Sequence, residues 1–198
     1  MTFEATRRAL HGVAELVLAG PQYERSGTIW LRVTPGGFGT VAEPDLRIDG
    51  DQLVTGGLRL PLKGTPAELA DAAGARARTL TDVYHDGSGF ALDEPLEVDP
   101  QAAQRIADAF ARGDRALREF APDQTPVLWP EHFDLGITLD EVNYGISTGD
   151  AHISEPYAYV GPWTPRTGPF WNVSFGAAHP LSELDSIAEF FREGRAAA

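Results

Sequence analysis

The 198-residue sequence contains no cysteine, and Lys63 is its only lysine. Without cysteine the chain can form no disulfide, no thiolate zinc site and no cysteine nucleophile. No apolar run approaches the roughly 20 residues that a membrane-spanning helix needs. The apolar patch within residues 1–20 is also too short and too interrupted for a signal peptide. From these absences we expect a cytoplasmic protein.

Positive charge is scarce as well. The 29 acidic residues outnumber the 16 basic ones, which gives a formal net charge of −13 at pH 7. A surface of this sign repels nucleic-acid phosphates and anionic membranes, so neither is an expected partner. Hydrophobic residues make up 42% and charged residues 23%, near the composition of globular proteins. The chain is therefore long enough and apolar enough to bury a core.

The N-terminal segment has the periodicity of an amphipathic helix. Its apolar residues recur at i, i+3, i+4 and i+7 and are Leu10, Val13, Ala14 and Val17. Gly20 and Pro21 predict the end of this helix, because both residues are typical of helix stops. We place His11 on the solvent-facing side of the helix, next to Arg7 and Arg8.

The sequence then changes to the period of two that is typical of strands. Alternating segments occur at 28–34, 46–48 and 58–62. The turn-forming pairs Asp49-Gly50 and Gly56-Gly57 between them predict short antiparallel hairpins. Further strands are predicted at 132–139, 142–147, 157–163 and 170–175.

Three more helices have recognisable starts. A capping box between Thr65 and Glu68 predicts a short helix. A longer helix is predicted at 99–120, and the last one begins at Ser182 with Asp185 in its capping box. The apolar stripe of the long helix consists of Ala103, Ile106, Phe110, Leu117 and Phe120.

Together these elements predict an α+β fold with a mainly antiparallel sheet. We expect a curved sheet or a partly open barrel, packed with one long helix and shorter capped helices. Residues 1–198 should form a single domain. Its halves, 1–98 and 99–198, each contain strands followed by a capped helix, so two structurally similar halves are an alternative organisation.

A hairpin in the second half contains two glycines that we expect to face each other. If residues 140–141 form a two-residue turn, Gly136 lies opposite Gly145. Glycine inside a strand usually marks a close approach by another group. The pair therefore predicts a slot that is filled by an aromatic ring of the same chain or by a ligand. The candidate rings are Trp129, Tyr157, Tyr159, Trp163 and Trp171.

His132 and Asp134 alternate along a predicted strand, so their side chains should share one face. A carboxylate that orients an imidazole predicts catalytic residues or a metal site. The third metal ligand would be His152, with His179 as the alternative. A structural hydrogen bond between the His132 and Asp134 side chains explains the same pattern without function, and the sequence indicates no particular cofactor.

We expect a small-molecule-binding domain with an aromatic-lined pocket. The predicted ligand-binding residues are Trp129, Asn143, Tyr157, Tyr159, Trp163 and Arg166, beside His132 and Asp134. A metal-dependent enzyme that uses the His132–Asp134 pair is the first alternative. A homo-oligomeric interaction protein, such as a homodimer, is the second, because Tyr and Trp are also enriched at interfaces.

Two motifs lie in this aromatic region: W-P-E-H-F-D at Trp129–Asp134 and E-P-Y-A-Y-V-G-P-W at Glu155–Trp163. They resemble motifs of an uncharacterised family of bacterial proteins of unknown function. The resemblance covers these two stretches best. It implies no activity, cofactor or residue role for this chain.

Overall fold

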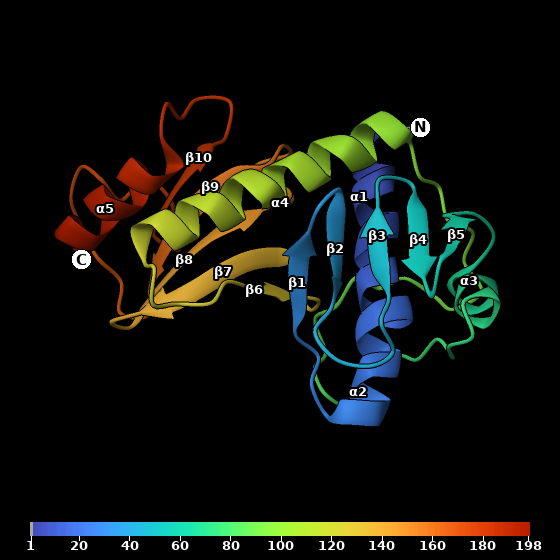
Figure 1. The fold of residues 1–198 in the computed structure, drawn as a ribbon. Coiled ribbons are helices and arrows are strands. Elements are labelled where there is room, and N and C mark those ends of the chain that lie inside the picture. The colour runs from blue at the N-terminus through green and yellow to red at the C-terminus, as the bar shows by residue number, and fades with distance from the viewer. Residues whose placement is uncertain (1) are drawn as a thin grey trace. The chain divides into compact units, whose positions relative to one another are not determined.

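The computed structural model describes residues 2–198, which fold as two compact units (Figure 1). Unit 1 comprises the described residues up to Asp108 together with Leu128–Phe133, and unit 2 comprises Ala109–Val127 and Asp134–Ala198. Helices and strands occur in both units, and the strand pairings within each are antiparallel. The predicted α+β class is therefore confirmed. Among residues 2–198, the strands of neither unit close into a barrel.

Unit 1 begins with one continuous helical segment. It consists of α1 (Phe3–Gly12), the π-helix η1 (Val13–Ala19) and α2 (Gly20–Ser26). The predicted helix end at Gly20-Pro21 is wrong, because Pro21 lies in the first turn of α2, where its missing N–H is least costly. The segment ends instead at Gly27, which has a left-handed φ of 72°. All residues of η1 are buried, and η1 packs against β1, β2 and α3.

The strands of unit 1 form an antiparallel meander. They are β1 (Leu31–Thr34), β2 (Gly37–Thr40), β3 (Arg47–Asp49), β4 (Gln52–Thr55) and β5 (Leu58–Pro61). They follow one another in chain order, and β6 (Val127–Trp129), which was not expected, pairs with β1. The helix α3 (Pro66–Ala72) has the predicted capping box, in which Thr65 and Glu68 bond to each other's backbone N–H.

The longest helix, α4 (Pro100–Phe120), begins in unit 1 and ends in unit 2. Asp99 precedes it and accepts hydrogen bonds from the N–H groups of Gln101 and Ala102, each at 3.0 Å. The predicted apolar stripe is buried along the whole helix. Within residues 2–198, no helix has both the length and the apolar composition needed to cross a membrane.

Unit 2 contains a second antiparallel meander, followed by a helix. Its elements are β7 (Asp134–Leu139), β8 (Val142–Ser147), β9 (Tyr157–Pro162), β10 (Ala177–Pro180) and α5 (Ile187–Ala197). The strands are ordered β7-β8-β9-β10. The predicted hairpin register is confirmed, with Gly136 opposite Gly145 and left-handed φ values of 53° and 62° at Asp140 and Glu141.

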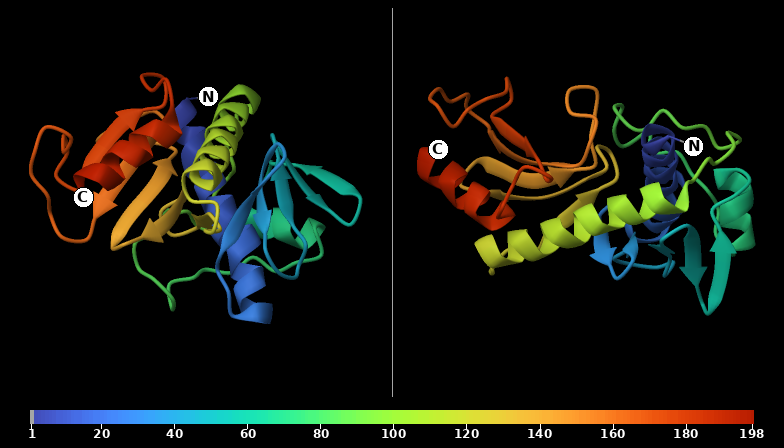
Figure 2. Two further views of the ribbon diagram at one scale, coloured as in Figure 1. Left: turned by 60° about the vertical axis from the view of Figure 1, so that its left-hand side comes forward. Right: turned by 90° about the horizontal axis from the view of Figure 1, so that it is seen from above.

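One face of this meander carries the core of unit 2. The end of α4 and α5 both pack on it (Figure 2), with Gly113 against Ile146 and Gly194 against Val160. The aromatic rings of Phe120, Tyr144 and Phe191 meet there, with centroids 4.7 to 5.9 Å apart. The glycines let the helices approach closely, because a side chain at either position would overlap the strand residue.

Two predictions near the C-terminus are wrong. Residues 170–175 form turns and an isolated bridge, and the strand lies at β10 instead. The last helix begins at Ile187 rather than near Ser182, because Ser186 accepts the Glu189 N–H and caps it. This later start places the first buried residue of α5 directly after its cap.

Candidate functional site

The slot at the paired glycines is filled by Tyr159. A Cβ atom at Gly145 would lie 2.5 Å from the Tyr159 hydroxyl oxygen and 2.6 Å from the carbonyl oxygen of Leu135. At Gly136 the corresponding distance to the Tyr159 hydroxyl is 3.2 Å. The predicted slot is therefore confirmed, and its occupant is a ring of the same chain.

The Tyr159 hydroxyl donates a hydrogen bond to the Asp134 carboxylate. Burial and the neighbouring Asp134 charge raise the pKa of Tyr159 well above its ordinary value, so the phenol stays a neutral donor. The expected alternation of His132 and Asp134 is wrong, because Phe133 has a left-handed φ of 51° and β7 begins only at Asp134. The His132 side chain is 62% exposed, and its Nε2 lies 3.9 Å from a Glu131 carboxylate oxygen.

Asp150 stabilises the loop between β8 and β9 through hydrogen bonds to its carboxylate. Its carboxylate accepts hydrogen bonds from the Tyr157 hydroxyl at 2.6 Å and from the N–H groups of His152 and Ile153 at 2.7 and 2.9 Å. Burial alone raises the pKa of Asp150, but these hydrogen bonds outweigh it and lower the pKa below its ordinary value. The His152 side chain is exposed in this loop.

Five of the predicted site residues lie on one face of the β7–β9 strands, opposite the helix-covered face. They are Asp134, Asn143, Tyr157, Tyr159 and Trp163. Asn143 Oδ1 accepts from Thr138 Oγ1 at 2.8 Å and from Trp163 Nε1 at 3.3 Å. Most polar groups of these side chains are thus hydrogen-bonded to other groups of the same chain.

The other predicted site residues are not part of this face. Trp129 and His132 belong to unit 1, where the Trp129 ring packs edge-on against Trp30 at 6.1 Å. Arg166 is exposed in a loop. Across residues 2–198, no three His, Asp or Glu side chains form a group that could hold a metal ion. The structure therefore does not assemble the predicted ligands His132 and Asp134 with His152 or His179.

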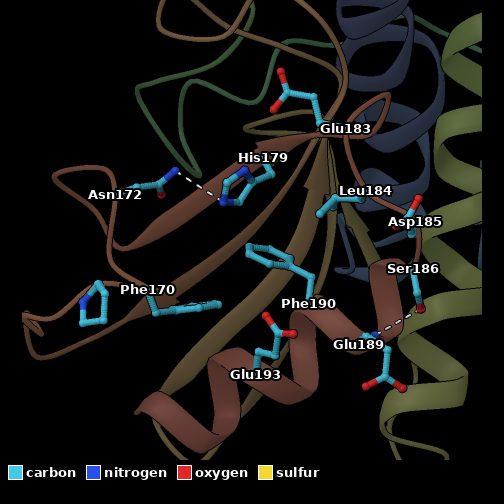
Figure 3. Close-up of a pocket in the computed structure, with 11 residues that line it drawn as sticks. Phe170, Asn172, His179, Glu183, Leu184, Asp185, Ser186, Glu189, Phe190 and Glu193 are labelled. Atoms are coloured by element: carbon cyan, nitrogen blue, oxygen red, sulfur yellow. Dashed lines mark hydrogen bonds between the residues drawn. The ribbon is translucent and has the colours of Figure 1, made fainter.

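Unit 2 contains a pocket of about 490 Å³ on the α5 side of β10 (Figure 3). It is lined by Pro169, Phe170, Asn172, His179, Glu183, Leu184, Asp185, Ser186, Glu189, Phe190 and Glu193. His179 is the only predicted site residue among them. The segments that build the pocket are the 169–172 loop, β10, the 183–186 turn and the outer side of α5.

Asn172 organises the β10 side of the pocket. Its side chain accepts from the Ala178 N–H at 2.9 Å and donates to the Ala178 carbonyl at 3.0 Å. These two bonds occupy backbone groups of a strand at the end of the unit 2 strand order, as a further strand would. His179 follows, and its pairing with Ala158 places it on the face that packs α5. There its ring lies edge-on to Phe190, 5.5 Å between centroids.

Aromatic rings form the apolar wall of the pocket. Phe170 and Phe190 are stacked with centroids 5.4 Å apart and an angle of 29° between their planes. Phe190 is only 5% exposed, whereas Phe170 is half-buried. Trp171 packs perpendicular to Phe170 at 4.9 Å and braces the loop from which Phe170 comes.

Four of the remaining lining residues are acidic. Glu183, Asp185, Glu189 and Glu193 contribute carboxylates, and none of the lining residues is Arg or Lys. Glu189 forms an ion pair with Arg192, which also reaches Glu119 at 2.9 Å. The i, i+4 spacing of Glu189 and Glu193 is visible in the sequence. The sequence does not show that the 169–172 loop faces these two residues, because the position of this loop depends on the placement of β10.

Unit 1 contains a separate cluster of buried polar side chains. Glu15 is 6% exposed and accepts from the Tyr84 hydroxyl at 3.0 Å and the Ser88 N–H at 2.7 Å. The predicted solvent-facing position of His11 is wrong. Its Nε2 lies 2.7 Å from the Pro130 carbonyl, and its ring stacks on Phe133 at 5.4 Å. Burial lowers the pKa of His11, although the nearby Glu15 charge partly offsets this effect.

No family model, curated protein or solved structure matches this chain. The resemblance of its two aromatic motifs to bacterial proteins stays a prediction. The pocket and the sheet face are therefore the features of this chain that bear on its function.

Proposed function

We propose that the protein is a small-molecule-binding domain and that its ligand occupies the pocket between the 169–172 loop, β10 and α5. The observation that carries this proposal is the cavity of about 490 Å³ with an aromatic wall and an acidic rim. Ligand sites typically have volumes of about 300–1,000 Å³, an apolar lining and a few polar groups. The pocket matches this description in size and in its aromatic wall, and its lining is more polar, with seven polar or charged residues among eleven.

The sheet face with the predicted aromatic residues supports ligand binding less well. Tyr159 fills the glycine slot, and its hydroxyl is bonded to Asp134. The Tyr157 hydroxyl is bonded to Asp150 in the same way. A ligand on this face would have to displace these internal hydrogen bonds, each of which contributes about 1 kcal/mol.

The test is a fragment screen observed on the backbone amides of the isotopically labelled protein. We expect bound fragments to shift the amides of the 169–172 loop, His179 and residues 183–193, and to leave β7 unchanged. Amide shifts confined to Asp134, Asn143 and Tyr159 would indicate that the ligand binds on the sheet face instead. If no fragment in a diverse library binds, the proposed function is wrong.

A metal-dependent enzyme remains the first alternative, and it has its own test. Thermal melts of wild type and His132→Ala, with and without a divalent metal, separate the two functions. We expect no metal-induced shift and a change in stability within about 0.5 kcal/mol, because the His132 side chain is largely exposed. A metal-dependent rise in Tm that His132→Ala abolishes would favour the enzyme.

A homo-oligomeric interaction protein is the second alternative, and one observation favours it. Trp163 and Phe175 of unit 2 are 63% and 40% exposed, and exposed large aromatic residues are enriched at interfaces. Light scattering of wild type and Trp163→Ala tests this function. A dimer that the substitution dissociates would support it.

A further inference from the structure

The pocket is negatively charged on more than one side. Glu183 and Asp185 come from the turn before α5, whereas Glu189 and Glu193 come from successive turns of α5 (Figure 3). Glu183, Asp185 and Glu193 are exposed to solvent, and among residues 2–198 their side chains have no hydrogen bond or ion pair that would compensate their charge. Such a pocket attracts cations and repels anions.

The charge lies beside apolar surface. Figure 3 shows the Glu193 carboxylate directed toward the rings of Phe170 and Phe190. An aromatic ring face also attracts a cation, through its quadrupole. The pairing of ring and carboxylate therefore fits a ligand with a charged head and an apolar body.

The hydrogen-bonding groups of the pocket are mainly acceptors. Carboxylates only accept, and the Asn172 amide is already bonded to both backbone groups of Ala178. The second amide hydrogen of Asn172 lies toward His179, with 3.5 Å between the two nitrogens. A ligand that matches this lining must bring its own N–H donors or a diffuse positive charge.

A bare metal ion does not match the same lining. Metal ions need several ligand atoms that converge on one point. In the part of the chain that the structure describes, no three acidic or histidine side chains converge in that way. The pocket carboxylates are instead distributed along the turn and α5.

We infer that the pocket binds an organic cation with an apolar body, in the class of protonated aryl or alkyl amines. This inference rests on the proposed function, and it names the class of ligand. The carboxylate of Glu193 pairs with the ammonium group, and the exposed side of Phe170 contacts the apolar body.

Three probes of nearly equal size and different charge test the inference: benzylamine, benzyl alcohol and benzoate. Each is titrated into the full chain at pH 7 and low salt, and the amide shifts of the pocket are followed. We expect benzylamine to bind about fivefold more tightly than benzyl alcohol, because a partly exposed ion pair contributes about 1 kcal/mol. Benzoate should bind most weakly, and added salt should remove most of the difference.

Glu193→Gln is the matched variant, because it keeps the shape of the side chain and removes its charge. We expect benzylamine to bind about three- to fivefold more weakly to it, and benzyl alcohol to bind as to wild type. Asp123→Asn removes one exposed charge of the same unit outside the pocket, and it should leave both affinities unchanged. An equal loss in both variants would show a general charge effect and overturn the assignment to Glu193.

The results also separate this inference from the proposed function. If benzyl alcohol or benzoate binds as tightly as benzylamine, the cation preference is wrong while small-molecule binding stands. If benzylamine does not bind but other fragments occupy the pocket, the inference is overturned alone. If no fragment binds at all, both fail.

Discussion

The sheet face formed by β7–β9 and the pocket beside α5 use aromatic and acidic residues in opposite ways. On the face of β7–β9 opposite the helices, Tyr159 donates a hydrogen bond to Asp134, and Tyr157 donates one to Asp150 of the adjoining loop. In the pocket, the exposed carboxylates of Glu183 and Asp185 on the turn before α5 and of Glu193 on α5 have no side-chain partner within the described residues. The same residue types are thus internally bonded on the sheet face and available in the pocket.

This difference indicates which side chains contribute to stability and which to binding. A buried hydrogen bond between a carboxylate and a phenol fixes both groups, and its loss leaves a desolvated polar atom. Exposed carboxylates without a partner contribute little to the stability of the folded state. The tyrosine–aspartate pairs therefore have a structural role, and the pocket carboxylates are the groups through which the proposed ligand would bind.

The largest effect is expected at the glycine slot. Gly145→Ala should lower the free energy of unfolding by about 3 kcal/mol, because its Cβ would overlap both Tyr159 and the Leu135 backbone. Gly136→Ala should cost about 1 kcal/mol, because its nearest neighbours lie at 3.0 and 3.2 Å. Urea unfolding followed by fluorescence measures both values. A Gly145→Ala protein as stable as wild type would show that Tyr159 does not fill the slot.

The next effect compares the stability contributed by the hydrogen-bonded carboxylate of Asp134 with that of the unpaired pocket carboxylate of Glu193. Tyr159→Phe should lower the free energy of unfolding by about 2 kcal/mol, because it removes the hydroxyl that donates a hydrogen bond to Asp134. Glu193→Gln should change stability by no more than about 0.5 kcal/mol. Both values come from urea unfolding at pH 7. Equal losses in the two variants would remove the distinction between the sheet face and the pocket.

A smaller effect concerns pH. The pKa of Asp150 is lowered from its ordinary value of 3.8, so the unfolded chain binds this proton more readily. The stabilisation is therefore fully present above about pH 4 and is lost as the pH falls through the lower pKa of the folded state. Tyr157→Phe should cost about 1 kcal/mol at pH 7 and progressively less below pH 4. A cost that is constant from pH 7 to pH 3 would show that the bond does not stabilise the charged carboxylate.

The smallest effect is expected at Trp163, at the edge of the sheet face opposite the helices. Trp163→Ala should change stability by about 0.5 kcal/mol or less, because the indole is largely exposed and has one hydrogen bond at 3.3 Å. Thermal unfolding and light scattering on one sample measure the effect. A loss of several kcal/mol would mean that Trp163 is part of an interface, and the sheet face would then be an interaction surface.

Much of the fold follows from local patterns. The register of the β7–β8 hairpin was predictable because a two-residue turn and period-two alternation leave one pairing that buries the apolar side. The stripe of α4 and the capping box of α3 were predictable for the same reason, since each depends on residues within one or two turns. The glycine pair also predicted that another group approaches the hairpin closely.

The candidate site was much less predictable. Five aromatic residues were candidates for the glycine slot, and only the pairing of β9 with β8 selected Tyr159. The pocket was missed, apart from His179 as an alternative metal ligand. Its residues come from a loop, a turn, the last strand and the last helix, and no periodicity distinguishes these positions from ordinary surface.

The sequence by itself determined the register of the β7–β8 hairpin, the capping box of α3 and the apolar stripe of α4, because these features depend on neighbours in the chain. Only the tertiary structure decided that His11 is covered by residues 130–133 and that Pro21 lies inside a helical segment. It also decided that Phe170 and Phe190 meet beside His179. These contacts join segments that are distant in sequence, and they form because burying the rings together removes more apolar surface from water than either segment could alone.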